Sequence, residues 1–425
     1  TIPSGATINN QGTATNFGPT GSVSWQTTVK TSGFTATAGE GYFVDTSSGT
    51  ISVNLPAGTA GAVVGFKDYL NTFDTNKLTL VQNGSDKIGG STVNAELSLE
   101  GIAVTLVFVD STRGWLVTDS GLQNEAPTEK FIVATGGTIT TQCVNFKVHT
   151  FTSPGTFCVS CAGNSGGSNT VDYLVVAGGG GGGAYYGAGA GGGGARMSGG
   201  TTTGCYSVGP LGTSPSPVAA APVTATGFPI TVGGGGAFGG PCGPGADGSN
   251  SIFSSITSAG GGGGAGNNGP AADGRPGGSG GGATGGTPGA AADAGAGNTP
   301  PVSPPQGNPG GANTTQPAGI GASGGGAGAA GAVGGGGSTQ GGIGIINNIN
   351  PASGDPSGGS RYYAAGGNPS QTPCGTAGAA GGGGKGPGGP PTNGAGVTNT
   401  GGGGGGNGNG GAGGSGIVVI RYKFQ

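Results

Sequence analysis

The feature that most constrains this chain is its glycine-dominated region, residues 178–416. Of the 113 glycines, 90 lie at or after Gly178, interleaved mainly with Ala, Pro, Asn and Thr. The apolar run VDYLVVA (171–177) enters the region and IVVIRYKF (417–424) leaves it. A flexible linker has no need of an apolar strand at each end. We therefore expect a folded bundle with these two strands paired at its base.

Three classes of protein share a high glycine and proline content: collagens, disordered low-complexity chains and ordered polyglycine assemblies. Collagen needs glycine at every third position, and the runs in 319–337 break that register. Disordered chains usually carry many charges. Residues 178–416 hold only four basic and four acidic residues, which favours an ordered assembly, although disorder remains the alternative.

Strand-like runs pass directly into glycine runs at Ala177, Val232 and Ala259. A glycine chain that stays extended adopts a left-handed helix of the polyglycine II type, close to polyproline II, with about three residues per turn. Such a helix has no internal hydrogen bonds, so neighbouring helices must supply partners for its amides. We expect alanine to mark positions that face outward or away from the tightest contacts, and polar or bulky stretches to form loops at the ends of the bundle.

Residues 1–125 predict an all-β domain, an antiparallel β-sandwich used as a fibre or spacer module. Short runs alternate apolar and polar residues between turn residues. Alternation in 104–110 places Val104, Leu106 and Phe108 on one face, with a hairpin leading to Trp115 and Val117. Asp45, Asp68 and Asp110 are interpreted as turn or strand-edge residues. The large residues available for the core are Trp25, Phe34, Tyr42, Phe43, Phe66, Phe108 and Trp115.

Two sets of segments resemble bacteriophage proteins. GFTATAGEGYFVDTSSGTISVNLPAG and FKDYLNTFDTNKLTLVQNG, with GWLVT, resemble a domain of phage tail fibres and related virion appendages. KVHTFTSPGTF, VDYLVVAGGGGGG, FPITVGGGG, SNSIFSSITSAGGGGG and GGSGIVVIRYKF resemble, in this order, a glycine-rich domain of phage tail and appendage proteins. The expected organisation is a spacer (1–125), a β-strand base (126–177), the bundle (178–416) and a closing strand (417–425). Because the chain opens at Thr1 without a Met, either a leader has been removed or the sequence is part of a longer gene product, and we expect the second.

Several kinds of chemistry are excluded or disfavoured by composition. The net charge is −3 and only 7% of residues are charged, so nothing favours nucleic acid as a partner. No apolar stretch reaches 18 residues, which predicts no membrane span. One histidine and scattered carboxylates form no catalytic pattern. The many G-x-G-x-x-G matches lack a following helix, and Gly384-Lys385-Gly386 does not complete a P-loop. We predict no enzyme activity, no cofactor and no metal.

The six cysteines all follow residue 140. Cys158 and Cys161 form a C-x-x-C, but a second pair of zinc ligands and the helix of a redox motif are both missing. Structural disulfides fit an extracellular or virion setting, with the connectivity left open. The disulfide candidates are Cys143, Cys158, Cys161, Cys205, Cys242 and Cys374.

Aromatic and basic residues stand out within the glycine region as candidates for receptor binding, since Tyr and Arg are favoured at binding sites. The alternative is that they cover bundle ends or pack between subunits. An isoleucine cluster at 343–349 either caps the bundle or meets another protomer. The receptor-binding candidates are Tyr185, Tyr186, Arg196, Tyr206, Arg361, Tyr362 and Tyr363.

The leading hypothesis is a structural protein of a virion appendage, a tail fibre or adhesin tip, whose bundle loops bind a protein or glycan receptor on the host surface without chemistry. The fibre resemblance implies a homotrimer and contacts with other virion proteins, in a virion or extracellular location. One alternative is a purely architectural, self-assembling filament protein. Another is an ice-binding protein, because a polyglycine bundle can expose flat Ala/Thr faces.

Overall fold

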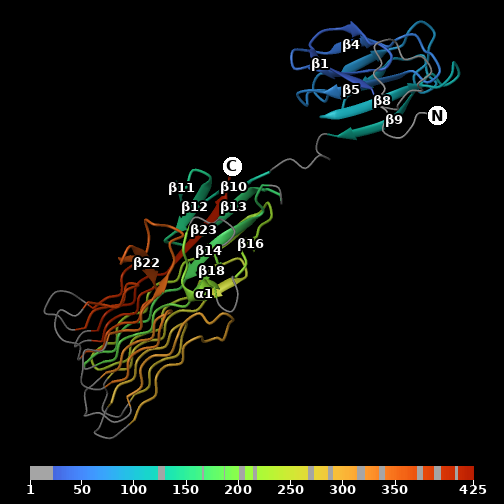
Figure 1. Cartoon of the computed structure of the whole chain (residues 1–425). Helices are drawn as coiled ribbons and strands as arrows, with labels where there is room; N and C mark the ends of the chain where they lie inside the picture. Colours follow the sequence, from blue (N-terminus) through green and yellow to red (C-terminus); the bar gives the residue numbers. More distant parts are fainter. Residues whose placement is uncertain are drawn as a thin grey trace, which may run out of the picture. The chain divides into compact units, whose positions relative to one another are not determined.

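The computed structural model describes residues 23–122, 130–164, 167–185, 187–200, 206–213, 218–266, 272–285, 291–313, 321–334, 340–370, 377–386, 394–406 and 410–425. The chain divides into two compact units, Thr1–Thr128 and Glu129–Gln425 (Figure 1). The prediction of an all-β class is confirmed, because the described residues form β-strands and one short helix, α1 (Pro210–Thr213). No helix among them is long and apolar enough to cross a membrane.

The described residues of the first unit form two facing sheets with nine strands in all. The strands are numbered along the chain. One sheet has the order β1-β3-β5-β8-β9, and the other has the order β2-β4-β6-β7. The strands are β1 (Ser24–Lys30), β2 (Phe34–Thr35), β3 (Glu40–Val44), β4 (Ile51–Asn54), β5 (Val63–Asp68), β6 (Leu78–Val81), β7 (Ala95–Leu97), β8 (Ile102–Phe108) and β9 (Trp115–Leu122).

The antiparallel prediction for this unit is wrong for its first half. Strands β1, β3 and β5 pair in parallel in one sheet, and β2, β4 and β6 pair in parallel in the other. The chain therefore coils from sheet to sheet, so each strand lies beside the one two places earlier. Antiparallel pairing begins with β5–β8, β6–β7 and the β8–β9 hairpin. Short turn-rich spacing fits both hairpins and coils, which is why it misled the prediction.

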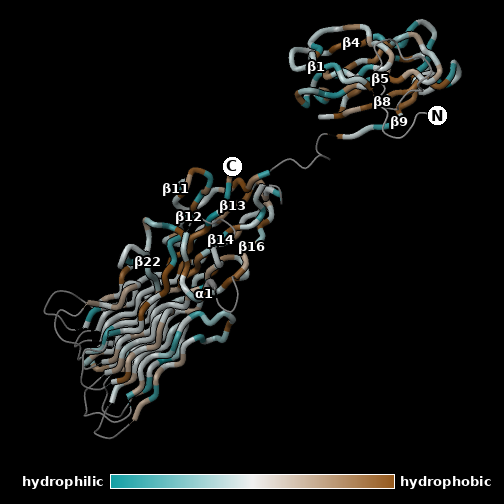
Figure 2. The backbone as a smooth tube through the Cα atoms, in the orientation of Figure 1, coloured by the Kyte–Doolittle hydropathy of each residue, from teal (hydrophilic) through white to brown (hydrophobic). Residues whose placement is uncertain are grey.

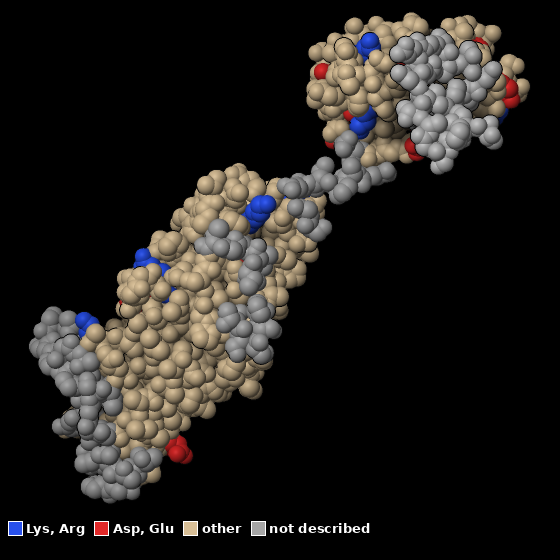
Figure 3. Space-filling view, in the orientation of Figure 1, with Lys and Arg blue, Asp and Glu red and all other residues tan. Residues whose placement is uncertain are grey.

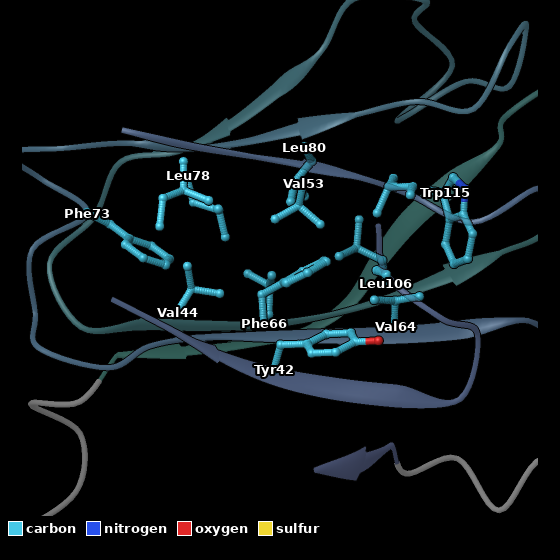
Figure 4. Close-up of a cluster of buried hydrophobic side chains, with 14 of the residues drawn as sticks. Tyr42, Val44, Val53, Val64, Phe66, Phe73, Leu78, Leu80, Leu106 and Trp115 are labelled. Carbon is cyan, nitrogen blue, oxygen red and sulfur yellow. The ribbon is translucent and has the colours of Figure 1, made fainter. Parts of the chain in front are cut away.

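The core of the first unit lies between the two sheets (Figure 4). Val104, Leu106 and Phe108 are buried on one face of β8, as the alternation predicts. Tyr42, Phe66 and Trp115 are also buried. These six side chains meet residues of the opposite sheet in one apolar cluster.

Trp25 is a core candidate that the structure places elsewhere. Its side chain is 42% exposed and its ring lies 5.0 Å from that of Phe43. A Cβ on Gly41 would lie within 3.0 Å of the Trp25 ring. The indole therefore covers the outer face of the sheet, where glycine leaves room for it.

The three aspartates interpreted as turn residues accept backbone hydrogen bonds. Asp68 is fully buried at the end of β5 and accepts the amides of Thr72, Phe73 and Gly101, each at 3.0 Å. Buried carboxylates need such partners. Asp45 and Asp110 accept amides two or three residues onward at the surface.

The second unit joins three sheets to the glycine-rich segments. The sheets have the orders β10-β13-β17-β18-β19, β11-β12-β23-β14-β15 with β16 paired to β14, and β20-β22-β21. The strands are β10 (Ile132–Thr135), β11 (Thr138–Gln142), β12 (Phe146–Phe151), β13 (Gly155–Ala162), β14 (Thr170–Val176), β15 (Ala195–Met197), β16 (Ala221–Pro222), β17 (Gly227–Thr231), β18 (Ser251–Phe253), β19 (Ile256–Ser258), β20 (Ile345–Ile346), β21 (Asp355–Ser357), β22 (Ser360–Tyr363) and β23 (Ile417–Lys423).

Strands β14 and β23 are the centre of this unit. They pair in antiparallel fashion, with Val176 opposite Ile417 and Asp172 opposite Arg421. Alternate residues of β23 enter two different apolar clusters, so the strand is buried on both faces. A near-continuous apolar run is what a strand covered on both faces requires. The segments that follow β14 and precede β23 are the first and last glycine runs.

His149 on β12 provides a pH test of this core. It is buried, its Nδ1 lies 2.7 Å from Gly136 O and its Nε2 lies 3.1 Å from Tyr422 Oη. Burial lowers the pKa of His149 below its usual 6.5. As the pH falls through about 6.5, His149 binds a proton more readily in the unfolded chain than in the folded chain. The free energy of unfolding should therefore fall as the pH is lowered.

We expect urea unfolding of the second unit to show this loss from about pH 7.5 to about pH 5.5, and His149→Gln to flatten it. His149 is the chain's one histidine, so no other imidazole contributes to the difference between the two proteins. Equal pH slopes for wild type and variant would contradict the assignment.

Candidate functional site

The glycine-rich segments of the second unit lie side by side as extended chains below the sheets (Figure 1). We call the described glycine-rich segments between Gly178 and Gly416 the glycine array. Figure 2 shows these segments as pale tubes, close to the middle of the hydropathy scale. Glycine has little side-chain material to bury, so backbone hydrogen bonding must hold this part of the unit together.

Hydrogen bonds from residues 178–183 repeat every three residues. Successive amides donate to three different neighbouring segments, and the fourth amide returns to the first neighbour. The carbonyl acceptors run in the opposite direction, again in steps of three. The six bonds, 2.8 to 3.0 Å long, are Gly178 N to Ser249 O, Gly179 N to Gly414 O, Gly180 N to Gly191 O, Gly181 N to Ala246 O, Gly182 N to Gly411 O and Gly183 N to Ala188 O.

The carbonyls of the same run face three further segments. Gly178 and Gly181 accept from the segment 261–264, and Gly179 and Gly182 accept from 236–239. Gly180 accepts from Gly404. Residues 178–183 thus have six hydrogen-bonded neighbours. Residues 188–194 likewise donate to 259–265, 322–325 and 401–404.

Glycine is required in this run for space rather than for backbone freedom. None of residues 178–183 has a φ in the left-handed region. A Cβ on any of them would nevertheless lie within 3.0 Å of a carbonyl oxygen in a neighbouring segment. The oxygens that would be struck belong to Gly234, Gly402, Gly262, Ala237, Gly405 and Ala265, in that order.

Side chains replace backbone acceptors at the edges of the glycine array, and they were not among the predicted functional residues. Asp247 Oδ1 accepts the Gly263 amide at 2.9 Å, and Asn250 Oδ1 accepts the Gly260 amide at 3.0 Å. Arg275 forms a two-point ion pair with the same Asp247, with both distances 2.8 Å. The sequence signal that could have identified these acceptors is the spacing of Asp247 and Asn250, two polar residues three positions apart in a glycine-rich segment.

Alanine does not mark outward positions throughout the glycine array. Ala246 is exposed, but Ala188 and Ala190 are fully buried. The expectation of an outward-facing position is therefore wrong for these two alanines. Charged residues are sparse on the face of the second unit that Figure 3 displays, which presents a nearly neutral surface.

The Arg361–Tyr363 stretch lies in a strand rather than in a loop. It belongs to β22, and Tyr363 is fully buried with its hydroxyl 2.8 Å from Ser353 Oγ. Burial raises the pKa of Tyr363 to about 12. Its side chain is thus a core residue that a receptor cannot reach, while Arg361 and Tyr362 are partly exposed.

The isoleucine cluster has divided roles. Ile345 and Ile349 are buried in an apolar cluster with Tyr363, whereas Ile343 is exposed.

Tyr206 packs against a buried cation. Arg421 is fully buried, and its guanidinium lies over the rings of Phe146 at 4.5 Å and Tyr206 at 4.9 Å. Asp172, opposite Arg421 on β14, accepts a 2.8 Å hydrogen bond from Ser198. Buried polar side chains such as Arg421, Asp172 and Ser198 stabilise the fold only while they keep their contacts with one another and with the surrounding rings. Tyr206 therefore has a structural role, while Arg196 on β15 is partly exposed.

Tyr185 is the most accessible of the described receptor-binding candidates. Its side chain is 54% exposed, and its backbone lies in the left-handed region with φ 49°. Tyr186, the next candidate, lies outside the described residues. Parts of the expected loops at 195–222, 266–277 and 368–378 also lie outside the described residues.

Four of the six cysteines lie in described segments. Cys143, Cys158, Cys161 and Cys242 have free thiols, so the structure forms no disulfide among these four. Cys205 and Cys374 fall outside the described residues. Within the described part of the chain, no group of three or more His, Cys, Asp or Glu residues could hold a metal ion.

Extended glycine segments that lie between two paired end strands, β14 and β23, define a class of glycine-rich structural proteins. A family model described as "Glycine-rich domain" matches residues 152–423, so the chain belongs to the glycine-rich domain family. Residues 4–121 match a second family model, "Bacteriophage T4 gp9/10-like protein, N-terminal".

A curated relative matches part of the chain. Over 128 residues the chain is 33% identical to "Baseplate wedge protein gp10" of Enterobacteria phage T4. The alignment covers 27% of this chain and 21% of the relative, so the match spans about a fifth of that protein's length. The resemblance to a phage appendage domain is confirmed, with a baseplate protein as the relative found.

The glycine array generates a matched pair of substitutions. At Gly180 an added Cβ would meet Gly262 O, whereas at Gly234 it would meet nothing within 4 Å. We expect Gly180→Ala to lower the free energy of unfolding of the second unit by about 1–3 kcal/mol or more, as overpacking does. Gly234→Ala should be neutral or stabilise it by about 0.4–1 kcal/mol, because alanine restricts the unfolded chain.

Chemical unfolding of both variants, followed by circular dichroism or intrinsic fluorescence, measures the difference. Equal stability of the two variants would contradict the close approach of segments in the array.

Proposed function

We propose that this protein is a structural component of a bacteriophage virion, built into the baseplate or tail. The observation that carries the proposal is the match of residues 4–121 to the gp9/10-like N-terminal family, together with the baseplate wedge relative. Contacts with other virion proteins follow from membership of such an assembly. No reaction is assigned to the chain.

The glycine array is, in this proposal, a bundle of polyglycine II helices. Three residues per turn rotate successive amides by about 120°, which suits three donor directions and three acceptor directions. The three-residue period and the six neighbours of residues 178–183 support this arrangement. The φ values outside the left-handed region are compatible with it.

The bundle then serves as a rigid support for receptor-binding residues. Tyr185 and Tyr186 lie between two glycine runs in the sequence, and Tyr185 is well exposed. An aromatic side chain on a rigid support loses little conformational entropy when it binds. Arg196, Arg361 and Tyr362 remain secondary candidates. Self-association, as a homotrimer or otherwise, would multiply the number of contacts with the host.

A purely architectural role is the second candidate function. It is favoured by the burial of Tyr363 and by the packing of Tyr206 against Arg421, because both recognition candidates then have contacts inside the protein. In that case the chain would assemble or extend the appendage without affinity for a host receptor.

Adsorption to cells separates the two roles. The purified chain should bind cells of the bacterium that the phage infects, and replacing both Tyr185 and Tyr186 by Ala should weaken binding at least about tenfold, or 1.4 kcal/mol. Tyr69→Ala, at an exposed tyrosine of the first unit, is the matched control and should leave binding unchanged.

Gold-labelled antibody against the chain should in addition mark the baseplate or tail of intact virions. Label on virions without cell binding would leave the architectural role, and absence of label would contradict the virion assignment itself.

A further inference from the structure

A cleft of about 400 Å³ opens in the second unit between three segments that are distant in sequence. One wall is the hairpin of β11 and β12, with Thr138 paired to Thr150. The others are the turns 350–354 and 397–400, and Ile417 at the start of β23 lies at the cleft as well. The volume falls within the range of small-ligand sites, roughly 300–1,000 Å³.

Most of the residues that line this cleft are polar, and none of them carries a charge. Six threonines, two asparagines and a serine line it, with no Asp, Glu, Lys, Arg or His among the lining residues. Each threonine hydroxyl can both donate and accept a hydrogen bond, and each threonine methyl adds a small apolar surface. Such a lining suits a ligand that also mixes hydroxyl groups with C–H faces.

The deeper polar groups of the cleft are held in place by the protein. Asn350 is buried; its Nδ2 donates to Thr150 Oγ1 at 2.9 Å and its Oδ1 accepts the Ala352 amide at 2.9 Å. Thr400 is also buried, and its hydroxyl donates to Val397 O at 2.7 Å. Asn399 Oδ1 accepts from Ser415 Oγ at 3.1 Å. These bonds fix the geometry of the cleft before any ligand arrives, which lowers the entropic cost of binding.

The rim hydroxyls are different. Within the described part of the chain, the hydroxyls of Thr138, Thr140, Thr152 and Thr398 have no hydrogen-bond partner, and all four residues are exposed. They come from both sides of the cleft. A ligand in the cleft can therefore take up their hydrogen bonds without breaking any bond within the protein.

We propose that this cleft binds a neutral saccharide. Sugar hydroxyls match the paired donor and acceptor capacity of the threonine rim, and sugar C–H groups match the threonine methyls and Ile417. An anionic ligand would lose its hydration without gaining an opposite charge, since the lining has none.

No aromatic ring lines the cleft, so stacking adds nothing and each site binds weakly, with Kd about 1 mM. Multiple copies in an assembly raise the overall affinity. The inference is independent of receptor binding at Tyr185, which is not among the lining residues.

Saturation-transfer NMR on the full chain tests the proposal, with a panel of neutral oligosaccharides and a matched panel of sialylated and phosphorylated ones. Signals are expected from members of the neutral panel. The double variant Thr138→Val/Thr140→Val and the single variant Thr398→Val, on opposite sides of the cleft, should each weaken binding about tenfold or more.

Thr141→Val is the matched control, because Thr141 follows Thr140 on β11 and points to the other face of the strand. It should bind as the wild type does, and thermal unfolding should show that all variants fold. Replacement of Tyr185 and Tyr186 should leave saccharide binding intact, so failure of the cleft and failure of the receptor-binding proposal are distinguishable.

Three results would overturn the saccharide site: no signal from any neutral oligosaccharide, equal binding of the acidic panel, or unchanged binding in both cleft variants.

Discussion

The hydrogen bond between the amide of one glycine segment and the carbonyl of another is the interaction on which the second unit depends. An extended glycine chain makes no hydrogen bonds within itself, so a neighbour must meet every interior amide. Residues 178–183 meet this demand with three donor and three acceptor directions. The same demand explains the missing Cβ atoms, since a methyl group at Gly180 would strike the carbonyl oxygen of Gly262.

Ordering glycine is costly, because no residue loses more conformational freedom on folding. A net gain of about 0.5–1.5 kcal/mol per hydrogen bond offsets that cost only narrowly. The apolar strands β14 and β23 therefore matter beyond their length. They bury both faces of a sheet in two apolar clusters and hold the first and last glycine runs in register. Asp247 and Asn250 accept glycine amides with their side chains at the edge of the array.

Sequence reasoning succeeded where period and burial agree. The apolar runs at both ends of the glycine region predicted that β14 and β23 pair with each other. The alternation of apolar and polar residues predicted the buried face of β8. The prediction failed where the path of the chain between strands decides the sheet topology, because turn spacing cannot distinguish a hairpin from the parallel coil of β1 to β6. It also failed for Trp25, which was predicted to lie in the core but is exposed on the outer face of the sheet. Tyr363 stood out among glycines as a recognition residue, yet isolation in sequence carries no information on burial. The threonine cleft was equally invisible, because three distant segments form it.

Amide hydrogen exchange of the full chain reports, residue by residue, whether each backbone amide of the glycine array is held in a hydrogen bond. The amides of residues 178–183 and 188–194 should be protected to the same degree as those of β14 and β23. Gly240, an exposed residue whose amide donates no backbone hydrogen bond within the described part of the chain, should exchange faster. Exchange of the two glycine runs at the rate of an unstructured peptide would contradict the hydrogen-bonded array and, with it, the proposed role as a rigid support.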